Sequence, residues 1–148
     1  SLIPFQESNS PADIDFELLQ QCNTYLEKAR QAKNKPPMAE VEAKIHFSQG
    51  QCSLMMTYSG RDETYDIAMH EFEQVTAAYD NGANLRVQEI AGEAYARLAL
   101  IYSLNGSLDQ AGTNYQKAAD TLKLISPDRA KLYQERADVI LGVTTPGP

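Results

Sequence analysis

The sequence predicts an all-α fold of about six helices joined by short connections. Apolar residues recur every three to four positions along most of the chain, and this is the period of an amphipathic helix. The alternating pattern of a half-buried strand is almost absent, and no turn dipeptide lies between two such stretches. Glycine, proline and N-capping residues interrupt the helical pattern repeatedly. Short connections make consecutive helices antiparallel neighbours.

The first helix is predicted to follow an irregular segment over residues 1–10. Ser10 is a good N-cap, and Pro11 suits the first helical position because its fixed φ angle is already helical. The Pro-Pro pair at 36–37 ends this helix, since proline cannot continue it.

Five further helices follow, each beginning or ending at a capping residue or a turn. Their predicted ranges are 38–58, 63–80, 85–104, 107–125 and 127–141. Gly106 can take the left-handed conformation that ends a helix. Ser107 and Gln110 are spaced as a capping box for the next helix. Ser126-Pro127 repeats the N-cap-plus-proline start.

Length, composition and charge describe one acidic domain. The 148 residues are a single-domain length, and we assign the helical domain to residues 11–141, followed by an irregular tail over 142–148. The net charge is −7, which argues against a nucleic-acid binder and against a polybasic membrane-surface protein. No apolar run approaches the ~20 residues that cross a bilayer. We therefore predict no nucleic-acid partner and no membrane insertion.

A pattern of large and small residues recurs along the chain. Its complete form is Tyr95-x2-Leu98-Ala99-x2-Tyr102 followed by Gly106, Ala111, Tyr115 and Ala118. Its second half recurs upstream as Ala68, Phe72 and Val75 and as Cys22, Leu26 and Ala29. Its first half recurs downstream as Tyr133, Arg136, Ala137 and Ile140. In the second helix the aligned positions are His46, Gln49, Gly50 and Ser53, which lack the large residues. Small residues let two helices approach closely, and large ones fill the gaps beside them.

This pattern resembles that of the tetratricopeptide repeat (TPR) family, in its longer, regulatory form. The resemblance covers about residues 11–141. It implies antiparallel helix hairpins stacked as a short right-handed α-solenoid. It also implies that Ala99, Ala111 and Ala118 are buried where the fourth and fifth helices cross, and that the concave groove binds an extended peptide or a partner helix.

Spacing along the first helix of each hairpin gives the residues expected to line this groove. They are Lys44, Phe47, Ser48, Gln51, Leu54, Met55, Glu93, Ala96, Arg97, Leu100, Ser103, Leu104, Gln134 and Asp138. Phe47 and Leu100 are the predicted apolar anchors, and Arg97 is expected to orient an acidic group on the peptide. An alternative interpretation leaves Phe47, Leu54 and Leu100 in the core. A carboxylate clamp is not predicted, because Ala96 and Leu100 stand where it needs Lys and Asn.

Two classes of function remain open. The first is a protein-interaction module within a regulator or scaffold. The second is a structural unit that forms a homo-oligomer through the open ends of the stack. Ligand sensing by a small molecule is a third class, but it needs a pocket that the sequence does not show.

Catalysis and metal binding have no recognisable pattern in the chain. His46 and His70 are the only histidines, and the second histidine of a zinc-binding H-E-x-x-H motif is missing. The sequence contains no G-x-S-x-G, P-loop or G-x-G-x-x-G motif. We therefore predict no enzyme activity and no cofactor.

The two cysteines, Cys22 and Cys52, belong to no metal-binding spacing. Two possibilities remain open: a disulfide between them, or two buried thiols. The thiols are favoured because cysteine is often a small apolar core residue. The start of the chain, Ser1-Leu2-Ile3-Pro4-Phe5, has no basic n-region of a signal peptide. The predicted location is therefore cytoplasmic, where thiols stay reduced.

Overall fold

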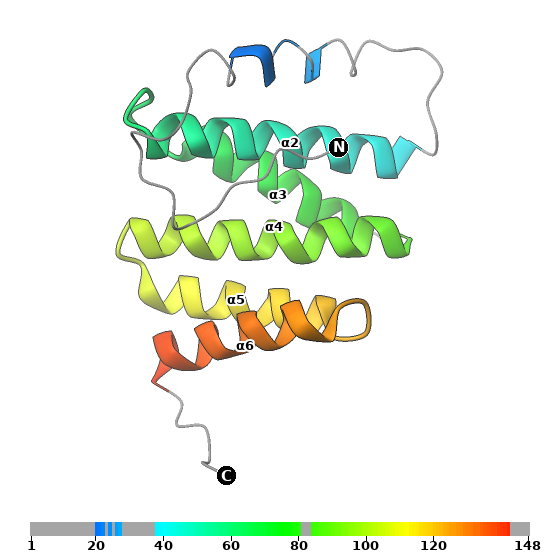
Figure 1. The fold of residues 1–148 in the computed structure, drawn as a ribbon, viewed down its shortest axis with the longest axis vertical. Coiled ribbons are helices and arrows are strands. Elements are labelled where there is room, and N and C mark those ends of the chain that lie inside the picture. Colours follow the sequence, from blue (N-terminus) through cyan, green and yellow to red (C-terminus); the bar gives the residue numbers. More distant parts are fainter. Residues whose placement is uncertain (1–19, 23, 25, 28–37, 81–83, 143–148) are drawn as a thin grey trace. The chain divides into compact units, whose positions relative to one another are not determined.

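The structure, a computed structural model, describes residues 20–22, 24, 26, 27, 38–80 and 84–142 (Figure 1). The helices are α2 (Met38–Tyr58), α3 (Asp66–Asp80), α4 (Leu85–Leu104), α5 (Leu108–Leu122) and α6 (Pro127–Leu141). The described residues contain no strand, and this confirms the predicted all-α fold. Much of the predicted first helix and nearly all of the two irregular ends lie outside the described residues.

The chain divides into two compact units. The first unit is residues 1–75 and the second is residues 76–148. The boundary falls inside α3, so the first unit contains α2 and most of α3. The second unit contains α4, α5 and α6.

In the first unit, α2 and α3 form an antiparallel hairpin. A Cβ atom added at Gly50 would lie 2.7 Å from Cε1 of Phe72, so the two helices approach closely at this point. Phe72 is fully buried, and its ring meets that of Phe47 edge-on with centroids 5.4 Å apart. At the turn, Thr57 Oγ1 donates to the carbonyl of Thr64 (2.7 Å). The small residue aligned with the repeat therefore packs against the large one.

In the second unit, α5 packs against both α4 and α6. Added Cβ atoms at Gly92 and Gly112 would lie 2.5 Å from the side chains of Leu122 and Leu141. These contacts pair the first half of α4 with the end of α5, and the start of α5 with the end of α6. Both pairs are therefore antiparallel, and α4 runs parallel to α6. The shared core is formed by Ala96, Ala99, Tyr115, Ala118, Ala119, Leu122, Ala130, Tyr133 and Ala137.

Most helix ends in the second unit agree with the sequence prediction. The bounds of α4 and α6 are those predicted. The backbone N–H of Val87 donates to the Asn84 side chain (3.0 Å), which is an N-cap that we did not predict. Gly106 has a φ angle of 82°, in the left-handed region expected for a residue that ends a helix.

One predicted capping interaction and one predicted helix start differ from the structure. The capping box of α5 is wrong, because the side chain of Ser107 makes no capping hydrogen bond. The third helix begins at Asp66 and not at 63. The hydrogen bond from Thr57 to the Thr64 carbonyl holds that carbonyl in the preceding turn.

Overpacking tests the contact between α4 and α5. Ala99, Ala111 and Ala118 are fully buried, as predicted. Replacing Ala111 with leucine should lower the free energy of unfolding by about 1–3 kcal/mol, because a well-packed core has no room for the larger side chain. Urea denaturation measures the change. Gln110→Leu is the control on the exposed side of α5, and equal stability of the two variants would contradict the assigned packing.

Cys22 and Cys52 form a disulfide, so the prediction of two unbonded thiols is wrong. Their Cα atoms are 6.6 Å apart, and both residues are buried. Leu26 packs with them in a small apolar cluster. Beside it, Gln49 Nε2 donates to Glu27 Oε1 (3.2 Å). The predicted cytoplasmic location loses its argument from reduced thiols, since disulfides persist in oxidising compartments.

Candidate partner-binding face

Most of the groove residues predicted in α2 are buried. Phe47, Ser48, Gln51, Leu54 and Met55 are each no more than 6% exposed. A residue in the core cannot serve as an anchor for a partner. Phe47 and Leu54 are therefore core residues, as in the alternative interpretation of the sequence. Lys44 is the exception, because its side chain is 44% exposed. Its Nζ lies 3.2 Å from Glu40 Oε1.

Four of the six predicted residues of α4 lie on one side of that helix, whereas Ala96, also predicted for the groove, is fully buried in the core. Glu93, Arg97, Leu100 and Leu104 follow one another at spacings of three and four residues, as does Glu89 before them. The side chains of Glu93 and Arg97, in the middle of this row, are 14% exposed. At its two ends, the side chain of Glu89 is 37% exposed and Leu104 is 43% exposed. We refer to these five residues of α4, together with Arg129 and Tyr133 of α6, as the α4–α6 face.

Glu93 connects the two helices of the α4–α6 face. Its Oε1 accepts a hydrogen bond from Arg129 Nη1 (2.9 Å), and its Oε2 accepts one from the Tyr133 hydroxyl (2.8 Å). Arg97 Nη2 lies farther from the same carboxylate, at 3.8 Å. Arg129 also donates to Glu89 Oε1 (3.3 Å). One glutamate thus positions both α6 side chains.

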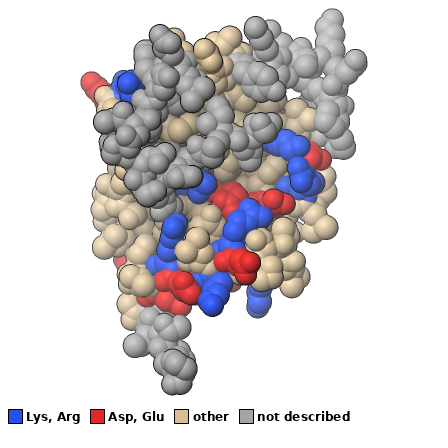
Figure 2. All heavy atoms as spheres, in the orientation of Figure 1, with Lys and Arg blue, Asp and Glu red and all other residues tan. Residues whose placement is uncertain are grey.

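Opposite charges balance on this face. Two glutamates, Glu89 and Glu93, stand beside two arginines, Arg97 and Arg129. Burial disfavours the charged Arg129 guanidinium, but the carboxylates of Glu93 and Glu89 outweigh this effect and raise its pKa. In Figure 2 acidic and basic atoms lie beside one another over this part of the molecule. The face therefore offers mixed polar contacts and no field of one sign.

Gln134 and Asp138 do not share this network, although the sequence placed them in one groove with Glu93. Gln134 Nε2 donates to Asp138 Oδ1 (2.9 Å), and Gln134 also bonds Gln116 of α5 (2.7 Å). These residues therefore face α5, and Arg129 and Tyr133 are the α6 residues that face Glu93. A signal for this pair was present in the sequence, because Arg129 and Tyr133 are four residues apart and so lie on one helix face.

In the pattern of large and small residues, Arg136 aligns with Leu98, which is buried. Its guanidinium carbon lies 5.7 Å from the ring centroid of Tyr115 and 5.9 Å from that of Tyr133. The two rings stack with centroids 6.0 Å apart, and both residues are buried. Arg136 thus covers the aromatic pair, which an arginine can do through its aliphatic stem and cation–π attraction.

The hydrogen bond between Tyr133 and Glu93 predicts a pH dependence of stability. Burial, followed by the nearby Glu93 carboxylate, raises the pKa of Tyr133 from 10.0 to about 12. Because the folded state holds this proton more tightly than the unfolded state does, the stabilisation is complete below pH 10. It is lost as the pH rises toward 12. Urea denaturation of Tyr133→Phe at several pH values should show a smaller loss of stability over this range. If the wild type and Tyr133→Phe lose stability equally between pH 10 and 12, the bond between Tyr133 and Glu93 is not the cause.

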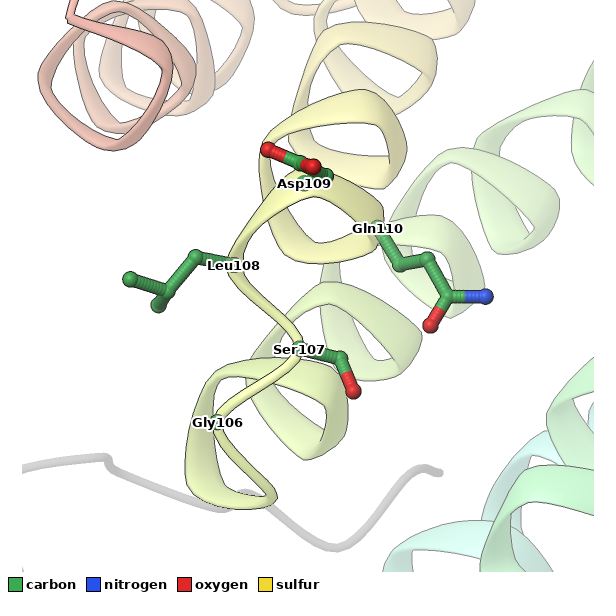
Figure 3. A pocket seen from close by; sticks show the side chains of 5 residues that line it. All are labelled: Gly106, Ser107, Leu108, Asp109 and Gln110. Atoms are coloured by element: carbon green, nitrogen blue, oxygen red, sulfur yellow. The ribbon is translucent and has the colours of Figure 1, made fainter.

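Two hollows lie among the described residues of α4, α5 and α6. One is lined by Gly106, Ser107, Leu108, Asp109 and Gln110 at the turn between α4 and α5. Figure 3 shows that Leu108, Asp109 and Gln110 point away from one another. A second hollow lies between α5 and α6 and includes Lys123 and Lys131. Ligand sites usually have polar groups that converge on one point, and the first hollow has none.

His46 has its partner on α3 and not on its own helix. Its Nδ1 is 2.6 Å from Oε2 of Glu71. His70, the other histidine, is exposed. Within the part of the chain that the structure describes, no three His, Cys, Asp or Glu side chains gather where they could hold a metal ion.

No family model, curated protein or solved structure matches this chain. Among the described helices, none has the length and apolar character needed to cross a membrane.

Proposed function

We propose that the chain is a TPR-like protein-interaction module that binds a polypeptide segment of a partner along the α4–α6 face. The observation that carries the proposal is the parallel arrangement of α4 and α6 with α5 packed against both. In a stack of helix hairpins, the first helices of successive hairpins lie side by side in this way and form a continuous binding surface.

The packing of both hairpins supports the TPR-like register. In the first unit, Gly50 lies against Phe72. Gly50 is at the small position of the pattern, and Phe72 is at the large one. In the second unit, the corresponding Ala99 and Tyr115 belong to the same core cluster. Aligned small and large residues lie in the core of both hairpins, and this favours a repeated unit over an unrelated helical bundle.

The chemistry of the face defines the partner in general terms. Leu100 and Leu104 provide apolar contacts toward the end of α4, and Arg97 is the cation beside them. Arg97 lies one helical turn before Leu100 on the same side of α4, so Arg97 is the arginine proposed to meet an acidic group on the partner. The partner is thus a segment with apolar side chains and one acidic group, as the sequence predicted, but without an anchor at Phe47.

Site-specific cross-linking and binding measurements test this proposal. A photoreactive residue at Leu104 should cross-link to the partner recovered from the source organism, whereas one at Leu124 should not, although Leu124 is 92% exposed. Arg97→Glu and Leu104→Asp should each weaken binding by about tenfold or more, which is typical of residues that dominate an interface.

Lys131→Glu is the matched control, because it reverses a charge on the exposed side of α6. Circular dichroism must show that each variant is folded. If Arg97→Glu leaves the affinity unchanged, or if Lys131→Glu lowers it equally, the binding surface is not the α4–α6 face.

Self-association is the second candidate, and exposed apolar residues on α6 favour it. Leu132, Val139 and Leu141 are 43%, 81% and 43% exposed, and apolar surface of this kind occurs at interfaces between chains. A dimer held by this helix should dissociate when Val139 is replaced by aspartate. Light scattering measures the mass, and a wild-type monomer at all concentrations would rule the dimer out.

A further inference from the structure

The turn between α4 and α5 contains a sequence motif that the proposed function does not use. Asn105, Gly106 and Ser107 form the pattern N-x-S/T, in which the middle residue is not proline. This is the acceptor pattern for N-linked glycosylation. The 148-residue sequence contains no second example, because Asn9-Ser10 is followed by proline.

The geometry of the turn leaves the acceptor side chain exposed. The turn is held by backbone hydrogen bonds, from Asn105 N to the Ile101 carbonyl (3.0 Å) and from Ser107 N to the Tyr102 carbonyl (2.8 Å). Asn105 is exposed, and no described residue forms a hydrogen bond with its side-chain amide. The Ser107 hydroxyl makes no capping bond. Neither side chain of the motif is needed to hold the turn.

The surroundings of the turn have room for a bulky group. The hollow lined by Gly106–Gln110 opens beside it, and in Figure 3 the labelled side chains of this turn spread outward. Gly106 has a φ angle of 82°, so the chain reverses sharply and presents the turn at the tip of the hairpin.

The Cys22–Cys52 disulfide is a second, independent observation. It lies in the first unit, whereas the motif lies in the second. Disulfides form in oxidising compartments such as the lumen of the endoplasmic reticulum. That compartment also contains the enzyme that transfers oligosaccharides to asparagine.

We propose that Asn105 is an N-glycosylation site and that the chain passes through an oxidising secretory compartment, contrary to the predicted cytoplasmic location. The co-substrate is an oligosaccharide carried on a polyprenyl diphosphate. In the transfer, Nδ2 of Asn105 forms a bond to the first sugar carbon and loses a proton. The bond from that carbon to the diphosphate oxygen breaks, and the polyprenyl diphosphate leaves with the electron pair.

Secretion of the full chain from eukaryotic cells, behind a cleavable leader, tests the proposal. The intact mass should show a ladder of sugar units. Peptide N-glycosidase should remove the ladder and convert the modified asparagine to aspartate. Both Asn105→Gln and Ser107→Ala should give the unmodified mass, whereas Ser107→Thr, which keeps a hydroxyl, should remain glycosylated.

Asn114→Gln is the matched control, because Asn114 lies on α5 outside any acceptor pattern. This variant should keep the glycan on Asn105. Ser107→Ala and Ser107→Thr keep the test decisive if Asn105→Gln is not secreted. A secreted wild-type chain that has its disulfide but no sugar would overturn the proposal. So would a glycan that persists in Ser107→Ala.

Discussion

Replacement of Phe72 with alanine is expected to lower the free energy of unfolding by about 3–5 kcal/mol, the usual range for a buried phenylalanine. Phe72 is fully buried, packs edge-on against Phe47 and covers Gly50. The truncation therefore leaves a cavity that the rigid backbone of α2 cannot fill. Urea denaturation followed by circular dichroism measures the loss.

A variant of the exposed residue two positions earlier on α3 provides the control. His70→Ala should change the stability by less than about 0.5 kcal/mol, as is usual for surface substitutions. If Phe72→Ala costs no more than His70→Ala, then Phe72 does not close the hairpin of α2 and α3.

Loss of the Cys22–Cys52 bond should lower the free energy of unfolding by about 3–4 kcal/mol. The bond closes a loop with a sequence separation of 30 residues, and the crosslink restricts the unfolded chain by roughly this amount. Cys22→Ala, Cys52→Ala and the double variant should have similar stabilities, because each removes the same bond. Thermal denaturation measures the effect.

A reducing agent distinguishes loss of the bond from loss of packing. Dithiothreitol should lower the melting temperature of the wild type toward that of Cys22→Ala and should not change the variant. If the wild type is equally stable with and without reductant, while a thiol assay shows that the bond has been broken, the disulfide does not stabilise the fold.

The helices of the second unit could be predicted because their ends carry strong local signals. Gly106 and Ser126-Pro127 separate α4, α5 and α6 in the sequence, and the structure has the same divisions. The small residues Ala99, Ala111 and Ala118 fixed the contact between α4 and α5, because only small side chains permit so close an approach.

The orientation of α2 could not be predicted, because buried residues occur on all of its sides. Phe47, Gln51 and Leu54 look from their spacing like one groove face, and Ile45 and Cys52 look like a core face, yet all five are buried. Periodicity locates a face only where one side of the helix is polar. Spacing therefore gave no means to distinguish groove from core on this helix.

The polar contacts of the candidate face were only partly predictable. Glu93 and Arg97 were predicted from spacing on α4, but their α6 neighbours depend on how α6 is rotated about its axis. The sequence favoured Gln134 and Asp138, and the structure places Arg129 and Tyr133 beside Glu93. The disulfide was unpredictable for a related reason, since two cysteines 30 residues apart carry no information about their distance in space.

Three glycines, each covered by a large side chain of the next helix, limit how this sequence can diverge. Gly50 lies under Phe72, Gly92 under Leu122 and Gly112 under Leu141. A methyl group at any of these positions would collide with its neighbour, so evolution can enlarge the glycine only if the opposite residue shrinks in step. Related sequences should therefore vary in size at these pairs in opposite directions. Such correlated pairs would reveal the pairing of the helices in a distant homologue whose overall sequence no longer resembles this one.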